Sequence, residues 1–212
     1  MDNLFKRLRI FRTQWLDKHI RVRKFLKTDF SLISNNCWGS MHFYQRFGIK
    51  YNTPTVGLYI SDSDFIRFCL DLPFYLHQPI KFIPPQESPA YLEVCRWGNL
   101  NPQNNDHFSF PVGMIGDVTL WFMHYGSIEE AESKWVRRAS RVNINDILIK
   151  WSQRYTDDDD TVNHFLEIPY NKIGIVDSSC GITSNDLVKL SGWNELKDEG
   201  GDEISFTGKH IN

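Results

Sequence analysis

Short apolar stretches alternate with amphipathic stretches along most of the chain, and this alternation restricts the fold more than any other feature of the sequence. The apolar stretches have the length of strands, whereas the amphipathic stretches repeat their apolar residues at helical intervals. The expected strands cover residues 30–34, 55–60, 118–124, 146–151 and 173–176. Alternating strands and helices favour a parallel sheet with helices on both faces. We therefore predict a three-layer α/β fold with a mainly parallel sheet.

The expected helices cover residues 38–47, 62–76, 127–142 and a stretch that begins at 157. Two of them carry start signals: Ser61 and Asp62 are competent N-caps, and Ser127 with Glu130 forms a capping box. The acidic run at 157–160 places negative charge at the positive end of a helix dipole. The Arg-rich face of the third helix, with Trp135, Arg137, Arg138 and Arg141, is predicted to be exposed, and an arginine at its edge could bind a phosphate.

Residues 84–112 interrupt the alternation with five prolines and a polar run at 99–106. Only residues 91–97 look like a strand, so we predict an irregular insertion. Long loops in compact domains are uncommon and often functional, so the insertion either forms one wall of a binding cleft or has no role in binding. The predicted organisation is a basic N-terminal helix at 1–28, a single α/β domain at 29–194, and a polar tail at 195–212.

The first 28 residues are strongly basic, with nine Lys/Arg against two Asp, whereas the whole chain carries a net charge of -2. Apolar residues recur in this segment at the spacing of an amphipathic helix. Its basic face is either solvated while the helix packs on its own domain, or attached to anionic lipid or a membrane-bound synthase. The overall charge gives no reason to expect a nucleic acid partner.

The four cysteines are too widely spaced for a zinc site or a disulfide framework, so we expect reduced thiols and no bound metal. They are Cys37, Cys69, Cys95 and Cys180. No apolar run reaches the roughly 20 residues of a membrane-spanning helix, and the charged N-terminus does not resemble a secretory signal. These features predict a cytoplasmic protein that touches the inner membrane face at most peripherally.

The segment at 34–40 follows the first expected strand and leads into the first expected helix, which places Cys37 at the carboxyl edge of the sheet. Ligands of parallel α/β sheets bind at this edge. A helix N-terminus and nearby backbone N–H groups favour a thiolate, so the pKa of Cys37 is expected below the ordinary value of about 8.5. This position suits a nucleophile for acyl transfer.

A base and its orienting carboxylate are available at two other strand ends. His124 ends the strand at 118–124, and Asp177 follows the strand at 173–176. In a parallel sheet both would share the edge of Cys37, as nucleophilic catalysis requires. His42, about one turn into the first helix, is a rival base. The residues expected to contact the substrate or its oxyanion are Asn35, Asn36, Trp38, Gly39 and His42.

A structural interpretation of the same residues stays open. Free cysteine is often a buried, small apolar residue, so Cys37 could belong to the core. Asn35 and Asn36 could simply form a turn and cap a helix. His124 could be a hydrogen-bonded structural histidine.

Several sequence blocks, in the same order, resemble the bacterial domain-of-unknown-function family 1919, which is associated with exopolysaccharide and capsule biosynthesis. The blocks lie at 30–39, 51–57, 64–66, 111–117, 124–125 and 135–138. The resemblance covers about residues 28–180 and implies an α/β fold and a link to surface polysaccharide, but no established activity. The Asn-Asn-Cys block at 35–37 also looks similar to a Gly-Asn-Cys segment of a capsule-biosynthesis family that binds coenzyme A, although Asn35 replaces the glycine and Trp38 follows the cysteine.

Three functions are compatible with these features. The first is a cysteine-dependent acyltransferase that moves acetyl from coenzyme A to a hydroxyl of a carbohydrate or lipid-linked sugar, with Cys37 as nucleophile, His124 as base and Asp177 as orienter. The second is a sugar-nucleotide-dependent glycosyltransferase in which the acidic run at 157–160 holds a divalent metal. The third is a non-catalytic scaffold of a polysaccharide synthesis complex. The sequence leaves the oligomeric state undetermined.

Overall fold

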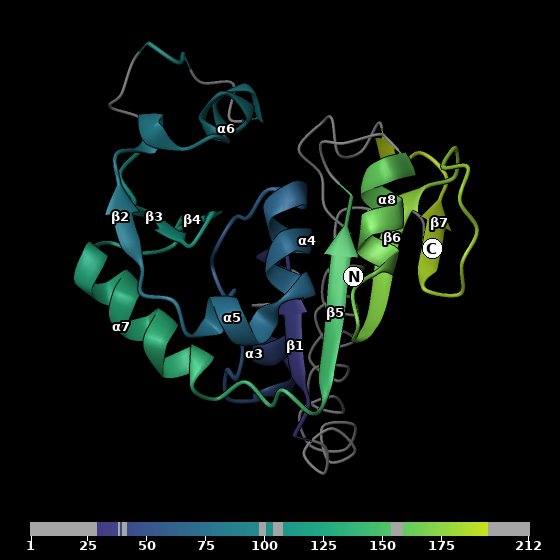
Figure 1. Ribbon diagram of the computed structural model, residues 1–212, viewed down its shortest axis with the longest axis horizontal. Helices are drawn as coiled ribbons and strands as arrows, with labels where there is room; N and C mark the ends of the chain where they lie inside the picture. Colours follow the sequence, from purple (N-terminus) through teal and green to yellow (C-terminus); the bar gives the residue numbers. More distant parts are fainter. Residues whose placement is uncertain are drawn as a thin grey trace, which may run out of the picture.

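The described part of the chain forms a parallel and an antiparallel sheet, with one helix, α4 (Asp62–Leu70), lying between them (Figure 1). The computed structural model describes residues 29–37, 39, 42–97, 101–103, 108–153 and 159–194. The predicted helix at 1–28, the predicted tail at 195–212 and the candidate residue Trp38 lie outside the described residues.

Four strands make the parallel sheet: β1 (Ser31–Ser34), β5 (Ile147–Ser152), β6 (Asn171–Asp177) and β7 (Leu187–Leu190). Their order is β1-β5-β6-β7, and every neighbouring pair is parallel. All of β1 is buried, as expected for a strand covered on both faces. The predicted α/β fold with a mainly parallel sheet is confirmed, and β7 is a strand that the sequence did not reveal.

The antiparallel sheet contains β2 (Lys81–Ile83), β3 (Val112–Ile115) and β4 (Val118–Trp121) in that order. The prediction that residues 118–124 join the parallel sheet is therefore wrong. Ile115 pairs with Val118 across a two-residue turn in which Gly116 has φ 59°. A tight turn of this kind forces its two strands to run antiparallel, so β4 pairs with β3 rather than with β1 or β5.

Two expected strands have other structures. Residues 55–60 form a buried turn around Gly57 (φ 71°), and within this stretch only Tyr59 bridges to a strand residue, Trp121. Residues 91–97 are the helix α6 (Tyr91–Trp97) instead of a strand. Tyr91, Val94 and Cys95 are buried at helical spacing, while Leu92 is exposed. Short apolar runs do not separate strands from buried turns or helices, which explains both errors.

The remaining helices largely follow the predicted positions. Ser61 and Ser127 accept hydrogen bonds from the backbone N–H groups of Asp64 and Glu130, as N-caps do. The expected helix at 62–76 is divided at Asp71, whose backbone (φ -136°, ψ 60°) leaves the helical region before Pro73. The elements not yet named are α3 (Phe43–Phe47), α5 (Leu72–Leu76), the 3₁₀ turn η3 (Pro85–Glu87), α7 (Ile128–Ala139) and α8 (Asp159–Leu166).

The core has two parts. The larger one joins the parallel sheet to α4, α7 and α8, and within it Trp151 stacks on Phe165 at 4.9 Å between ring centroids. The smaller one packs α6 against Tyr59 and Trp121. The predicted insertion is thus partly folded onto the antiparallel sheet. No helix in the described ranges is both long enough and apolar enough to cross a membrane.

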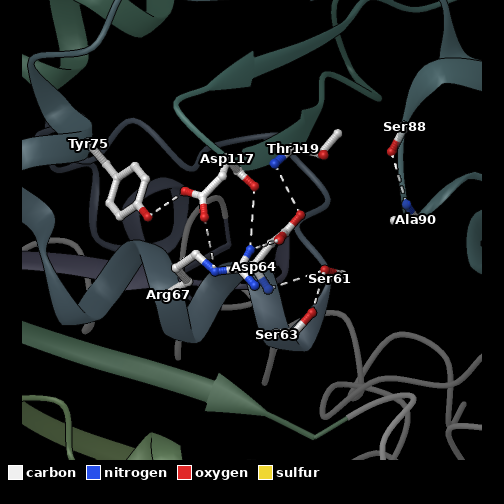
Figure 2. Close-up of polar contacts among 9 residues, drawn as sticks. All are labelled: Ser61, Ser63, Asp64, Arg67, Tyr75, Ser88, Ala90, Asp117 and Thr119. Carbon is white, nitrogen blue, oxygen red and sulfur yellow. Dashed lines mark hydrogen bonds and ion pairs between the residues drawn. The ribbon is translucent and has the colours of Figure 1, made fainter.

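Polar contacts on α4 hold it to the turn between β3 and β4 (Figure 2). Asp64 accepts hydrogen bonds from Arg67 (2.8 Å) and from the backbone N–H of Thr119 (3.0 Å). Asp117 in turn accepts one from the Tyr75 hydroxyl at 2.7 Å, and its Oδ2 lies 3.5 Å from Arg67 Nε. We call Asp64, Arg67, Tyr75, Asp117 and Thr119 the α4 clamp.

Candidate functional site

The carboxyl end of β1 is tied to the end of β5 by the side chain of Asn35. Asn35 Nδ2 donates to the Ser152 carbonyl (2.9 Å), and Ser152 N donates back to Asn35 Oδ1 (3.1 Å). The same Nδ2 also donates to Asp62 Oδ1 (3.3 Å), which accepts a further bond from Trp151 Nε1 (3.0 Å). The Asn35 amide therefore continues the hydrogen bonding between β1 and β5 beyond the end of β1, and it attaches the start of α4 to the parallel sheet.

Asn36 points to a second group of polar side chains at the same edge. Its Oδ1 accepts hydrogen bonds from Ser34 Oγ (3.1 Å) and Lys150 Nζ (3.2 Å), and its Nδ2 donates to Ser152 Oγ (3.4 Å). Lys150 Nζ also donates to Ser152 Oγ. Ser34, Ser152 and Lys150 are all at most 2% exposed. We call Ser34, Asn35, Asn36, Asp62, Lys150, Trp151 and Ser152 the edge network.

Cys37 follows this network directly, and its Sγ lies 3.7 Å from His124 Nε2. The thiol is half-buried and the imidazole is exposed. A sulfur and a ring nitrogen at this distance can share a proton, so the pair can act as a nucleophile with its base. The two residues meet although His124 follows a strand of the antiparallel sheet, so the expectation that they are neighbours holds for a different topological reason.

The turn at 53–57 brings His124 to the thiol. Ser34 N donates to Thr55 Oγ1 (3.4 Å), which fixes the turn to β1, and His124 N donates to the Gly57 carbonyl (3.3 Å). A Cβ on Gly57 would lie 3.1 Å from the Cβ of His124. Glycine at this position permits both the positive φ and the close approach of the histidine.

Arg138 braces the other side of this turn. Its Nη1 donates to the Tyr125 hydroxyl (2.5 Å) and to the Val56 carbonyl (3.4 Å), and Tyr125 itself donates to Val56 (2.5 Å). The guanidinium also lies 5.0 Å from the centroid of the Tyr51 ring. Arg138 and its neighbour Trp135 are buried, so the prediction of an exposed Arg-rich face is wrong at these two positions.

Asp177, the predicted orienter, lies at the end of β6 and has other partners. Its Oδ1 accepts from Ser179 N (2.8 Å) and its Oδ2 from Asn194 N (3.1 Å). Burial raises the pKa of Asp177, but these backbone donors outweigh it and lower the pKa below its ordinary value. The described contacts of Asp177 include none with His124. Because β5 lies between β6 and β1, its role as orienter stays a prediction that the observed contacts do not support.

The other predicted site residues are placed as follows. Asn35 uses Nδ2 for two protein acceptors, so as an oxyanion donor it would have to break one of these bonds. His42 is exposed and precedes α3, and among the described contacts it has none with Cys37. Gly39 is buried where a Cβ would lie 2.6 Å from the Ser34 Cβ, so a larger residue would push the Cys37 turn off β1.

Among the described residues, the remaining cysteines and carboxylates do not extend the site, whereas Asp157 and Asp158 of the acidic run at 157–160 lie outside the described residues. Cys69 and Cys95 are buried, and burial raises the pKa of Cys69. Cys180 lies near Asp159, with its Sγ 3.8 Å from Oδ1. In the described ranges, no three His, Cys, Asp or Glu side chains gather as a metal site would require.

Lys150, Ser152 and Asp62 are the site residues that sequence reasoning missed. A signal for Lys150 was present, because a lysine in the middle of the apolar strand at 146–151 needs buried partners or an exit to solvent. Asp62 was assigned only a capping role. Its second role depends on contact with Asn35 and Trp151, which only the fold creates.

Comparisons with known proteins extend over most of the chain. A family model described as "Domain of unknown function (DUF1919)" matches residues 9–194. An uncharacterised protein of Haemophilus influenzae is 30% identical over 152 residues, which are 71% of this chain and 63% of that protein. The chain therefore spans less than two thirds of the length of this relative.

Proposed function

This chain belongs to the DUF1919 family, and from that premise we propose that it is a cysteine-dependent acyltransferase of surface polysaccharide biosynthesis. The observation that carries the proposal is the 3.7 Å approach of Cys37 Sγ to His124 Nε2 beside the carboxyl ends of β1 and β5. This edge is where parallel α/β sheets bind their ligands.

The proposed reaction has two acyl transfers. His124 takes the proton of Cys37, and the thiolate attacks the carbonyl carbon of a thioester such as acetyl-coenzyme A. The tetrahedral intermediate expels the thiolate of coenzyme A, which takes the proton from His124 and leaves acetyl on Cys37. A sugar hydroxyl then attacks the acetyl carbon, His124 takes the hydroxyl proton, and Cys37 leaves as the thiolate before it is reprotonated.

The acceptor and the donor come from the resemblances and not from contacts. The link to exopolysaccharide and capsule supports a carbohydrate or lipid-linked sugar hydroxyl, and the Asn-Asn-Cys block supports coenzyme A as the acyl carrier. An exposed His124 lets a bulky acceptor reach the pair. A cytoplasmic location, with residues 1–28 contacting the inner membrane face or a synthase, belongs to the same proposal.

The test is to incubate the full chain with acetyl-coenzyme A and to look for acetylation of Cys37 by intact-protein and peptide mass spectrometry. We expect one acetyl group on Cys37 in the wild type, none there in Cys37→Ala, and formation slowed about 100-fold or more in His124→Gln, because general base catalysis is lost.

Cys180→Ala is the matched control, since Cys180 is also a half-buried thiol, and it should acetylate Cys37 like the wild type. Acetyl transfer to a polysaccharide acceptor at the full wild-type rate by Cys37→Ala would refute the covalent mechanism.

A further inference from the structure

The parallel sheet has two faces, and the described core clusters lie against one of them. Ile149 and Trp151 of β5 belong to the large cluster with α4 and α8. Because successive residues of a strand point to opposite faces, Leu148 and Lys150 point the other way. We call this second side the outer face. In the register of the sheet its apolar residues are Leu32, Leu148, Ile173, Ile175 and Val188.

Burial on the outer face decreases from β1 to β7. Leu32 on β1 is 3% exposed, whereas Ile173 on β6 is 37% and Val188 on β7 is 40% exposed. Leu32 belongs to neither core cluster of the described residues. A strand residue is buried this deeply only when other atoms pack on its face. The part of the outer face near β1 and β5 is therefore covered, and the described core clusters do not supply this cover.

Aromatic side chains of α3 border the outer face beside β1. A Cβ on Gly39 would lie 3.6 Å from Leu32 Cδ2, so the chain crosses this side of β1 on its way to α3. There Phe43 contacts Phe30, with 5.9 Å between ring centroids, and Phe47, with 5.0 Å. The apolar surface thus continues from the strands onto α3.

We propose that residues 1–28 of the same chain dock on the outer face as an amphipathic helix over β1 and β5, and so form the second helical layer of the sheet. This segment lies outside the described residues and leads at Asp29 directly into β1. Its sequence carries one apolar stripe at helical spacing, which such a surface would bury. The stripe consists of Leu4, Leu8, Phe11, Trp15 and Val22.

The length of the segment suits this position. A helix from residue 4 to residue 22 is about 27 Å long, and a six-residue strand such as β5 is about 20 Å long. Residues 23–28 can span up to roughly 20 Å, which is enough to return the chain to the start of β1. The family model begins at residue 9, so most of the segment belongs to the same domain as the sheet.

The charge of the segment also suits docking on its own chain. Nine Lys/Arg and two Asp give residues 1–28 a net charge of +7, and the total of -2 leaves -9 for the remaining residues. Opposite net charges favour association of the two parts. The tail at 195–212, by contrast, is polar and has no comparable apolar stripe.

Docking determines how the segment can meet a membrane. With the apolar stripe on the sheet, the basic side of the helix points outward, so contact with anionic lipid uses charge and not insertion of Trp15. The inference does not depend on the chemistry proposed for Cys37, and either proposal can fail without the other.

The experiment places the photo-crosslinker p-benzoylphenylalanine at position 173 of the full chain and maps the crosslinked peptides by mass spectrometry. Ile173 is already 37% exposed, so the larger side chain fits there. We expect crosslinks to residues 1–28 of the same chain. The same crosslinker in place of Val136 is the control, since Val136 is 60% exposed on α7, away from the parallel sheet (Figure 1), and it should give none to this segment.

Other occupants of the outer face give different products. Crosslinks from position 173 to residues 195–212, or a covalent product of twice the chain mass, would overturn the inference in favour of the tail or of a second copy. A folded protein without crosslinks to residues 1–28, whose binding to phosphatidylglycerol vesicles requires Phe11, would assign the stripe to lipid and overturn it as well.

A pair of variants tests whether the apolar stripe is what docks. Phe11→Asp and Thr13→Asp each add one negative charge, but Thr13 lies about 200° around the helix from Phe11. We expect Phe11→Asp to lower the yield of the crosslink about tenfold or more, because it buries a carboxylate, and Thr13→Asp to leave the yield nearly unchanged. Should Phe11→Asp fail to fold, as judged by circular dichroism, Phe11→Ala replaces it. Equal yields from the two variants would overturn the inference.

Discussion

Two polar clusters, the α4 clamp and the edge network, lie on different sides of α4, and the described partners of their charged side chains differ. Asp62 and Asp64 are two residues apart, about 200° around the helix, so one faces the parallel sheet and the other the antiparallel sheet. In the α4 clamp, Asp64 and Asp117 share the cation of Arg67, which is 44% exposed. In the edge network, the described contacts of buried Lys150 and Asp62 include amides, hydroxyls and an indole.

The difference indicates what each cluster is for. Burial raises the pKa of Asp64, while the hydrogen bond from Tyr75 lowers the pKa of Asp117. In the α4 clamp, ionised Asp64 therefore destabilises the folded state and ionised Asp117, which lies near solvent, stabilises it. Contacts of this type are adequately explained by docking a helix onto a hairpin turn. The edge network, by contrast, holds buried Lys150 and Asp62 through the asparagines that precede Cys37 in the chain. Buried polar networks of this type are expensive, and they cluster at functional sites.

The largest expected effect is at Asn35. Asn35→Ala removes three hydrogen bonds and leaves the backbone of Ser152 and the buried Asp62 short of partners. At about 1–3 kcal/mol for each unsatisfied buried group, we expect a loss of roughly 3–5 kcal/mol in the free energy of unfolding, measured by urea denaturation. Asn163→Ala, on an exposed position of α8, should stay within about 0.5 kcal/mol of the wild type. Equal losses of unfolding free energy in the two variants would mean that the edge network contributes no more to stability than an exposed position does.

A smaller effect is expected at Arg138, which supports the turn that carries His124. Arg138→Met removes the donors to Tyr125 and Val56 and should cost about 2–3 kcal/mol. It should also slow alkylation of Cys37 at neutral pH, because the turn that carries His124 loosens.

Arg137→Met provides the matched control, as its side chain is exposed one position earlier on α7. If Arg138→Met lowers thermal stability but leaves the alkylation rate unchanged, Arg138 is structural only. Arg138 would then have no influence on the pair formed by Cys37 and His124.

The smallest effect is expected in the clamp. The pKa of Asp117 is lowered chiefly by the hydrogen bond from Tyr75, so its stabilisation is present above the ordinary pKa of 3.8 and is lost as the pH falls through the folded value. Because the carboxylate is 67% exposed, Asp117→Asn should cost at most about 1 kcal/mol at neutral pH.

The same variant should differ less from the wild type in acid and in high salt, as measured by urea unfolding across pH. A difference in unfolding free energy that persists below the pKa of Asp117 in the folded state would show that Asp117 stabilises the clamp through its packing and not through its charge.

The sequence anticipated the parts of the fold that depend on near neighbours. The caps at Ser61 and Ser127 follow from side chains that bond backbone three residues away, and the confirmed strands β1, β5 and β6 follow from apolar runs. The errors lie where a run is short or where its partner is remote. Residues 91–97 form a helix because their buried face packs on Trp121, a contact that no local pattern encodes.

The site shows the same division. The thiol and imidazole were paired from strand ends, and they do meet, but through the turn at Gly57 and an antiparallel strand. Asp177 was placed beside them by the same rule, yet two strand spacings lie between β6 and β1. The rule that carboxyl ends of parallel strands share one edge predicts at which edge a residue lies. It does not predict the order of the strands along that edge.

By itself, the sequence determined an α/β chain with capped helices and a cysteine directly after its first strand, because these features depend on local periodicity and on side chains within one turn of each other. Only the tertiary structure decided that Lys150 and Ser152 contact Asn36, that Arg138 is buried, and that His124 contacts Cys37. Those arrangements depend on which strands pair and which turns pack together. Such choices are set by the free energy of the whole core, to which a single segment contributes only a small part.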